Sequence, residues 1–191
     1  MTGPQIMRRK CDCLDSRLVD VWQAISMHRA VRSFAERPIE PEKLELILRA
    51  GRRAPSSMNH QRWSFVACTD RETLKRLAKV GDWAGHLAGA AAAIALVTPD
   101  ATEDWEVESI AFDLGHCAQN MMLTAWELGI GSVHATVYDE NLTQQILGYP
   151  EGYRCRYVFS FGYPADPDDL TRQPSKGGRK PLAEIVHRER W

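Results

Sequence analysis

The chain has 191 residues, a formal net charge of -1, and 44% hydrophobic and 26% charged residues. This length suits one domain that buries most of its apolar surface without a stapling disulfide or metal. The nearly balanced charge gives the whole molecule no electrostatic reason to bind nucleic acid or an anionic membrane. Any anion site must therefore come from a local cluster of charge.

Every apolar run is shorter than the roughly 20 residues of a membrane span. The best candidate, residues 88–97, is mostly alanine and ends before Thr98 and Pro99. The first residues include basic side chains but no apolar stretch behind them, unlike a secretory signal. We therefore expect a cytoplasmic protein with no membrane partner.

The expected domain organisation is a flexible tail over residues 1–17 and a single domain over residues 18–191. The tail contains Cys11 and Cys13. One C-x-C pair without further ligands cannot complete a tetrahedral site, so we expect no metal.

Periodicity, capping residues and turn residues predict helices and strands that alternate along the domain. In chain order they are a helix over 18–28, a helix over 41–51, a strand over 63–69, a helix over 70–80, a strand over 90–98, a helix over 103–128, a strand over 132–138, a helix over 139–147 and a strand over 154–162. Pro41 suits a first helical position, and Asp70 and Asp139 suit N-caps. This order predicts an α/β or α+β protein.

The helix over 103–128 is the longest expected element, and it is apolar on more than one side. One side carries Ile110, Leu114, Cys117, Met121 and Ala125, while Phe112, Met122 and Trp126 lie off that stripe. One sheet cannot cover two sides of a helix. The pattern predicts either a buried central helix or one packed against a second subunit, with His116 as a hydrogen-bonded core residue.

The motifs exclude several chemistries. No strand is followed by GxGxxG, which argues against a dinucleotide held in a Rossmann crevice. The chain also lacks the GxSxG, HExxH and P-loop motifs of common hydrolases.

Three separated segments are rich in donors and are candidates for ligand binding: residues 28–32, the loop over 54–61, and the group Lys176, Arg179 and Lys180. Arg29 and Arg32 stand three apart at the end of the first helix, close enough to converge on a dianionic group such as a phosphate. The alternative is a pair of solvated surface cations. The loop over 54–61, APSSMNHQ, suits either a polar ligand or a plain helix-terminating turn.

Four motifs together resemble the nitroreductase superfamily. They are HRAVRSF at 28–34, APSSMNHQRW at 54–63, DLGHCAQNMMLTAWELGIGS at 113–132 and RKPLAEIVH at 179–187, in the order typical of that family. The resemblance implies an α+β fold with a mixed, mostly antiparallel sheet flanked by helices. It also implies an intertwined homodimer with two FMN sites at the subunit interface.

The resemblance assigns residues to FMN in three groups. His28, Arg29, Ala30 and Arg32 are expected around the phosphate and ribityl chain, with Arg179 closing the phosphate site; Pro55, Ser56, Ser57 and Asn59 along the flavin ring; and His134, Ala135 and Thr136 near the ring from the partner side. Thr136 is the expected donor near flavin N5.

The chain departs from the family pattern near the phosphate. His28 replaces an arginine and Ala30 replaces the usual serine, while Arg62 stands where proline is common. The first two changes remove one fixed charge and one hydroxyl. We therefore expect weaker FMN binding than the pattern would give.

The function that the resemblance implies is hydride transfer from NADH or NADPH, through FMN, to a small electron-poor acceptor such as a nitroaromatic, quinone or enone. The expected kinetics are ping-pong, and no protein residue is expected to be catalytic, because the cofactor performs the redox chemistry. The alternatives are an FMN-binding storage, sensor or regulatory protein without turnover, a flavin-modifying or dehalogenating member of the superfamily, and a scaffold without flavin.

Overall fold

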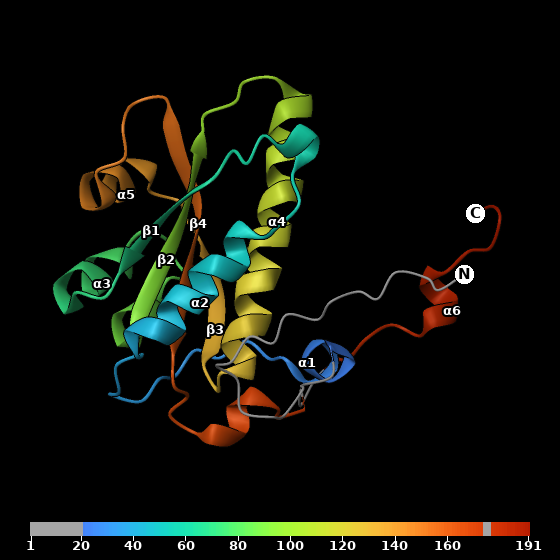
Figure 1. Cartoon of the computed structure of the whole chain (residues 1–191), viewed down its shortest axis with the longest axis horizontal. Helices are drawn as coiled ribbons and strands as arrows, with labels where there is room; N and C mark the ends of the chain where they lie inside the picture. Colours follow the sequence, from blue (N-terminus) through green and yellow to red (C-terminus); the bar gives the residue numbers. More distant parts are fainter. Residues whose placement is uncertain (1–20, 174–176) are drawn as a thin grey trace, which may run out of the picture.

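The structure is a computed structural model that describes residues 21–173 and 177–191 (Figure 1). The tail expected over residues 1–17, with Cys11 and Cys13, lies outside the described residues.

The sheet is 4-stranded, in the order β1-β2-β4-β3. Its strands are β1 (Ser64–Cys68), β2 (Ala92–Pro99), β3 (Gly131–Thr136) and β4 (Tyr153–Gly162), and each pairs antiparallel with its neighbours. A parallel contact occurs at an isolated bridge between Ala30 and Ser132. The expectation of a mostly antiparallel sheet in an α+β protein is confirmed.

The helices are α1 (Val21–Met27), α2 (Pro41–Arg52), α3 (Arg71–Leu77), α4 (Asp104–Glu127), α5 (Glu140–Leu147) and α6 (Leu182–Ile185), with 3₁₀ turns η1 (Ser57–Asn59), η2 (Gly85–Gly89) and η3 (Pro167–Leu170). Both predicted aspartate caps are present. Asp70 accepts a hydrogen bond from the Thr73 N–H at 2.8 Å, and Asp139 accepts one from the Leu142 N–H at 2.8 Å. These bonds satisfy donors that a helix start leaves free.

Helix α3 ends at Leu77 rather than at Val80, where the periodicity placed its end. The N–H of Val80 bonds to the carbonyl of Leu77 at 3.2 Å, three residues back instead of four. The last turn is therefore of the 3₁₀ type, which commonly closes helices.

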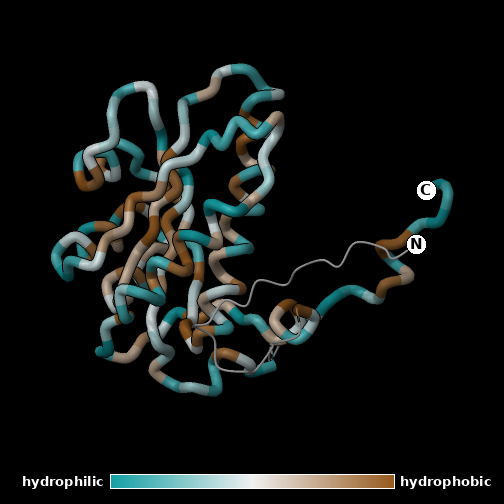
Figure 2. Tube along the Cα trace, viewed as in Figure 1, coloured by the Kyte–Doolittle hydropathy of each residue, from teal (hydrophilic) through white to brown (hydrophobic). Residues whose placement is uncertain are grey.

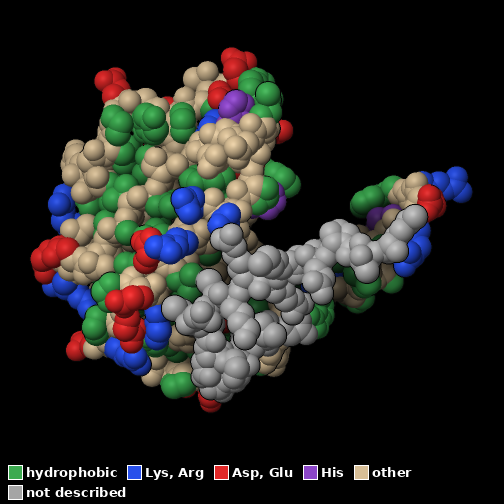
Figure 3. Space-filling model, in the orientation of Figure 1, with side chains coloured by type: hydrophobic (Ala, Val, Ile, Leu, Met, Phe, Trp, Pro, Cys, Tyr) green, Lys and Arg blue, Asp and Glu red, His purple; other side chains and the backbone are tan. Residues whose placement is uncertain are grey.

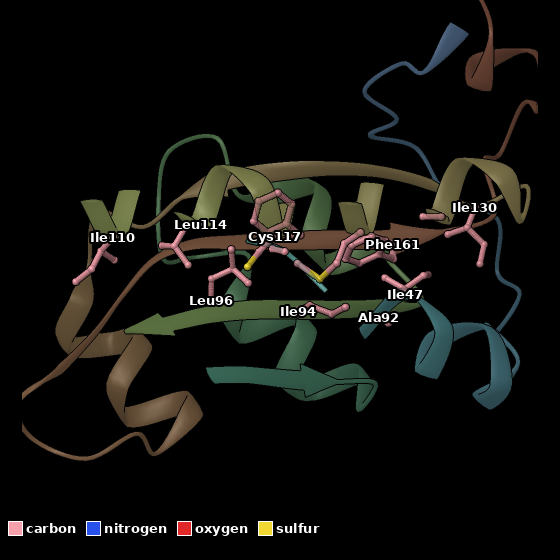
Figure 4. Close-up of a cluster of buried hydrophobic side chains, with 13 residues drawn as sticks. Ile47, Ala92, Ile94, Leu96, Ile110, Leu114, Cys117, Ile130 and Phe161 are labelled. Carbon is pink, nitrogen blue, oxygen red and sulfur yellow. The ribbon is translucent and has the colours of Figure 1, made fainter. Parts of the chain in front are cut away.

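Strand β2 explains how the core forms, because both of its faces are covered. Ile94 and Leu96 pack with α2 and α4 (Figure 4). Ala93 and Val97 alternate with them and join the second buried cluster, with Leu74 and Leu77 of α3 among its members. A strand buried on both faces reads as a continuous apolar run, as it does here. Figure 2 shows the hydrophobic segments gathered in the strands.

Helix α4 covers one face of the sheet with the predicted stripe, whose residues Ile110, Leu114, Cys117, Met121 and Ala125 are all buried. Among the described residues its other side is partly open, since Trp105 is 66% and Phe112 70% exposed, while Met122 and Trp126 are half-buried. Within the described part of the chain α4 is therefore not buried on all sides, which contradicts the alternative of a fully buried central helix.

The segment after residue 177, which we call the C-terminal arm, extends away from the body and carries α6 (Figure 1). Leu182 is 70% and Trp191 99% exposed. Figure 3 shows the arm standing clear of the body, with hydrophobic side chains among the charged ones. Among the helices in the described ranges, none is long and apolar enough to cross a membrane.

Candidate functional site

Nine of the twelve residues expected at the site line three surface depressions that have no lining residue in common. The α1 depression is lined by His28, Arg29, Ala30 and Arg179; the His86 depression by Arg32 and His134; and the serine-loop depression by Pro55, Ser56 and Ser57, each together with other residues. Their volumes are about 770, 560 and 610 Å³ respectively. Each lies within the range of small-molecule sites.

The α1 depression has the features of an anion site. Nε2 of His28 is buried and has no hydrogen-bond partner among the described residues. Burial, and next the neighbouring charge of Arg29, lower the pKa of His28 from 6.5. Arg179 also lines this depression; it is exposed, and within the described part of the chain it has no ion pair or hydrogen bond. A ligand with acceptor oxygens can therefore use both side chains.

The guanidinium of Arg29 already makes hydrogen bonds within the protein. It donates to the carbonyls of Ser26 and His28 at 2.8 Å each and to the carbonyl of Arg172 at 3.1 Å. It also donates to the Gln173 side chain at 3.1 Å. These bonds use four of the five guanidinium N–H groups. Arg29 joins the end of α1 to the segment before the C-terminal arm, and it retains one donor for a ligand.

Arg29 and Arg32 do not converge, contrary to the expectation from their spacing. Arg29 lines the α1 depression and Arg32 the His86 depression. Helix α1 ends at Met27, so the segment that follows is not helical. Residues three apart share a face on a helix but point to opposite sides of an extended chain.

The His86 depression contains a residue that the motifs did not identify. His86 lies in η2, and its Nδ1 is 2.8 Å from Oγ of the fully buried Ser160 on β4. Its Nε2 is buried with no hydrogen-bond partner among the described residues. Burial, then the charge of Arg32, lower the pKa of His86 to about 4. A neutral imidazole with one unused nitrogen thus lies beside the guanidinium of Arg32.

The serine-loop depression lies between residues 55–57 and the first half of α4. The N–H of Ser57 donates to both carboxylate oxygens of Asp113, at 3.2 Å each. Oγ of Ser56 accepts the N–H of Gln61 at 3.0 Å, across the loop. The loop is thereby folded back on itself and tied to the helix.

His116 also lines the serine-loop depression, and its expected role is wrong. It is only partly buried, its Nδ1 has no hydrogen-bond partner among the described residues, and its ring makes an edge contact with Phe112 at 4.5 Å. It is therefore not a hydrogen-bonded core residue. The cause is that the apolar stripe of α4 faces the sheet, while His116 lies outside that stripe.

Three further expected residues lie outside the three linings. Asn59 is exposed, and its side-chain oxygen accepts a hydrogen bond from Gln61 at 3.1 Å. The side chain of Ala135 is 2% exposed in the core, which leaves only its backbone for a ligand. Thr136 ends β3, beside Gly81.

The α1 depression and the serine loop lie at different ends of α4. Trp126 Nε1 donates to the carbonyl of Leu170, close to the segment that Arg29 binds, whereas Asp113 holds Ser57. Thirteen residues of helix separate Asp113 from Trp126, or about 20 Å at 1.5 Å per residue. One chain therefore does not bring the expected phosphate site and the expected ring-lining loop into a single pocket.

Comparison with known proteins gives a consistent result. A family model described as the nitroreductase family matches residues 25–84 and 82–163. A provisionally named NADH dehydrogenase/NAD(P)H nitroreductase from Archaeoglobus fulgidus is 32% identical over 171 residues, covering 87% of this chain and 96% of the relative.

Solved structures agree with these matches. Nitroreductase A from Vibrio parahaemolyticus superposes with a TM-score of 0.78 at 28% identity, covering 89% of this chain and 75% of that one. The NADPH:FMN oxidoreductase from Vibrio harveyi, in complex with NAD+, gives a TM-score of 0.76 at 27% identity, covering 89% and 77%.

Proposed function

The chain belongs to the nitroreductase family, and from this membership we propose that it is an NAD(P)H-dependent flavin oxidoreductase that binds FMN. The observation that carries the proposal is the α1 depression, whose lining includes both Arg179 and His28, a residue with a buried Nε2 that has no hydrogen-bond partner among the described residues. A relative of the same fold is an NADPH:FMN oxidoreductase by name.

The residues present fit FMN at two places. Arg179 suits a phosphate, because charge-assisted bonds to phosphate oxygens are among the strongest that proteins make, and His28 adds an imidazole nitrogen with no other partner among the described residues. In the His86 depression, Arg32 offers charged donors and His86 a neutral nitrogen, which suits the polar atoms of a flavin ring. We propose that Ser56, Ser57 and Asn59 line the remaining side of the ring.

Bound FMN supplies the redox chemistry, accepting hydride from NADH or NADPH and passing electrons to an electron-poor acceptor such as a nitroaromatic, quinone or enone. The protein's part is to bind, orient and exclude water. None of its side chains is required as an acid or base. If NAD(P)H and the acceptor were to occupy one binding place in turn, the kinetics would be ping-pong, which is what we expect.

We also propose that the working unit is a homodimer. Within one chain the serine loop is bound to α4 at Asp113, whereas Trp126, near the other end of the helix, binds the carbonyl of Leu170 close to the segment that Arg29 contacts. The two positions are about 20 Å apart along the helix. The outer side of α4 and the C-terminal arm both expose large apolar residues, which a second copy can cover. A partner's serine loop would then complete the flavin site. Arg32 and His134 line the same depression within a single chain, so a second copy of the chain is not required to bring these two residues together.

The test of the proposed function is an absorbance spectrum of the purified protein, before and after addition of FMN, followed by anaerobic titration with NADH and NADPH. We expect flavin bands that bleach with a nicotinamide and return when an acceptor is added. Initial rates at several acceptor concentrations should give parallel double-reciprocal lines. Absence of bound flavin after FMN addition contradicts the proposal, and bound flavin that neither nicotinamide bleaches favours a storage or sensor protein.

Position 28 gives a pH-dependent prediction. Because the pKa of His28 is lowered from 6.5, the imidazole is neutral at pH 8 and gains its proton as the pH falls below 6.5. We expect His28→Arg to bind FMN about tenfold more tightly at pH 8, since it restores a fixed charge beside the phosphate. The advantage should shrink toward pH 5.5, where the wild-type imidazole is more often charged.

The measurement is FMN fluorescence quenching for wild type, His28→Arg and His28→Gln between pH 5.5 and 8. His28→Gln, whose side chain is neutral at every pH used, shows how the titration of the FMN phosphate alone changes binding, so the wild type is compared with both variants. A ratio of the wild-type and His28→Gln dissociation constants that does not change with pH would show that His28 does not face the phosphate.

A further inference from the structure

The serine loop has a backbone that needs external support. Met58, Asn59 and Gln61 have φ values of 50°, 57° and 50°. Residues with a Cβ rarely adopt this left-handed region. Such conformations persist only where the surroundings hold them, and they cluster at functional sites. The question is which contacts hold this loop.

Both ends of the loop are bound to the same face of α4. At its start, the Ser57 N–H donates to Asp113. At its end, Arg62 donates to Glu106 at 2.9 Å and to Ser109 at 2.8 Å. Glu106, Ser109 and Asp113 are spaced by three and four residues, which places them on one side of a helix. We call these three residues the α4 clamp.

Asp113 is the unusual member of the clamp. It is a buried carboxylate at 4% exposure, and no cation forms an ion pair with it within the described parts of the chain. Burial of a carboxylate is costly unless hydrogen bonds compensate for the lost water. Its hydrogen-bond partner is a backbone N–H of the loop. A neutral residue at this buried position would cost less free energy of desolvation. We therefore connect the presence of a carboxylate here with its hydrogen bond to the Ser57 N–H.

We propose that Asp113 is a positioning residue for the flavin site, acting through the Ser57 N–H to keep the serine loop in its binding conformation. This inference rests on the proposed function. Asp113 lines the serine-loop depression together with Ser56 and Ser57, and its proposed role is to hold these two hydroxyl-bearing residues in place. With the loop held in advance, FMN binding does not have to bear the entropy of ordering it.

The first test compares Asp113→Leu with Asp113→Asn in the full-length protein. Leucine keeps the branched shape, although it is larger, and removes the acceptor, whereas asparagine keeps the size and one acceptor oxygen. We expect the FMN dissociation constant to rise about tenfold in Asp113→Leu, through faster release, and to stay within about threefold of wild type in Asp113→Asn. Equal affinity in all three proteins overturns the proposal, and so does equal weakening in both variants.

The second test removes the donor in place of the acceptor. Ser57→Pro deletes the N–H, and the backbone should accept it, because Ser56 has φ -142° and ψ 153°, the extended conformation favoured before proline. Ser57→Ala is the matched control, since it removes the hydroxyl but keeps the N–H. We expect Ser57→Pro to bind FMN about tenfold more weakly than Ser57→Ala.

A double variant decides whether the two positions act through one contact. If they do, Asp113→Leu combined with Ser57→Pro should weaken FMN binding no further than Ser57→Pro alone. Independent effects that multiply to about a hundredfold would overturn the proposal. If Asp113 were only structural, its replacement would lower the melting temperature of the apo-protein, but the effects of the two substitutions on FMN binding would not be coupled. Should Asp113→Leu fail to fold, the comparison of Ser57→Pro with Ser57→Ala still decides the outcome.

Failure of this inference is distinguishable from failure of the proposed function. Wild-type protein that binds no FMN contradicts the function itself. Wild-type protein that binds FMN, together with Asp113→Leu protein that binds it equally well, contradicts only the role of Asp113.

Discussion

Alanine at position 81 is expected to destabilise the protein by about 3 kcal/mol, at the upper end of overpacking effects. A Cβ there would lie 2.4 Å from the Thr136 carbonyl oxygen and 3.1 Å from the Tyr138 ring. The carbonyl cannot retreat, because Thr136 is paired with Tyr157 of β4. The Val80 carbonyl also accepts the Tyr138 N–H at 2.8 Å, which holds the two segments together.

Urea unfolding of Gly81→Ala and Gly85→Ala provides the measurement and its control. Gly85 lines the His86 depression, and a Cβ there meets no atom within 4 Å. We expect Gly85→Ala to stay within about 0.5 kcal/mol of wild type. Because residues 82–86 carry Trp83 and His86, Gly81→Ala should also weaken FMN binding. Equal unfolding midpoints for the two variants would show that the protein accommodates a Cβ at position 81 without loss of stability.

Deletion of residues 177–191 is expected to yield a folded monomer that no longer retains FMN. The deletion removes Arg179 from the α1 depression and the exposed apolar side chains of the arm, Leu182, Ile185, Val186 and Trp191. Each such side chain contributes about 1.5–3 kcal/mol when it is fully buried. If the proposed dimer buries them on a second copy, their removal is expected to dissociate it.

Size-exclusion chromatography with light scattering, together with the flavin spectrum, tests this prediction. Arg179→Ala is the matched control, because it removes the charge and keeps the arm. We expect it to remain dimeric while binding FMN at least about tenfold more weakly, as loss of a charge-assisted bond implies. A truncated chain that stays dimeric and yellow would contradict both the proposed dimer and the role of the arm.

The arrangement of helices and strands followed from local patterns. Asp70 and Asp139 cap helices with their own neighbouring N–H groups, and the stripe from Ile110 to Ala125 repeats within one helix. These signals involve residues a few positions apart, so they are visible in a single sequence. The family motifs added the expected fold and the list of FMN residues.

The grouping of site residues could not be predicted in this way. Arg29 and Arg32 share a motif yet line different depressions, because the chain is extended between them. His86 was not recognised, since its partner Ser160 is 74 residues away on β4. The role of Asp113 could not be predicted either, because its partner Ser57 lies 56 residues earlier in the chain and only the fold brings the two together.

Periodicity, caps and motif order thus defined the elements, the fold class and the family, because each depends on nearby residues or on their order. The pairing of Ser57 with Asp113 and of His86 with Ser160, the one-sided burial of α4, and the separation of the α1 depression from the serine loop depended on packing. Packing joins residues through the sheet and across helices, and sequence spacing does not encode which distant side chains will meet.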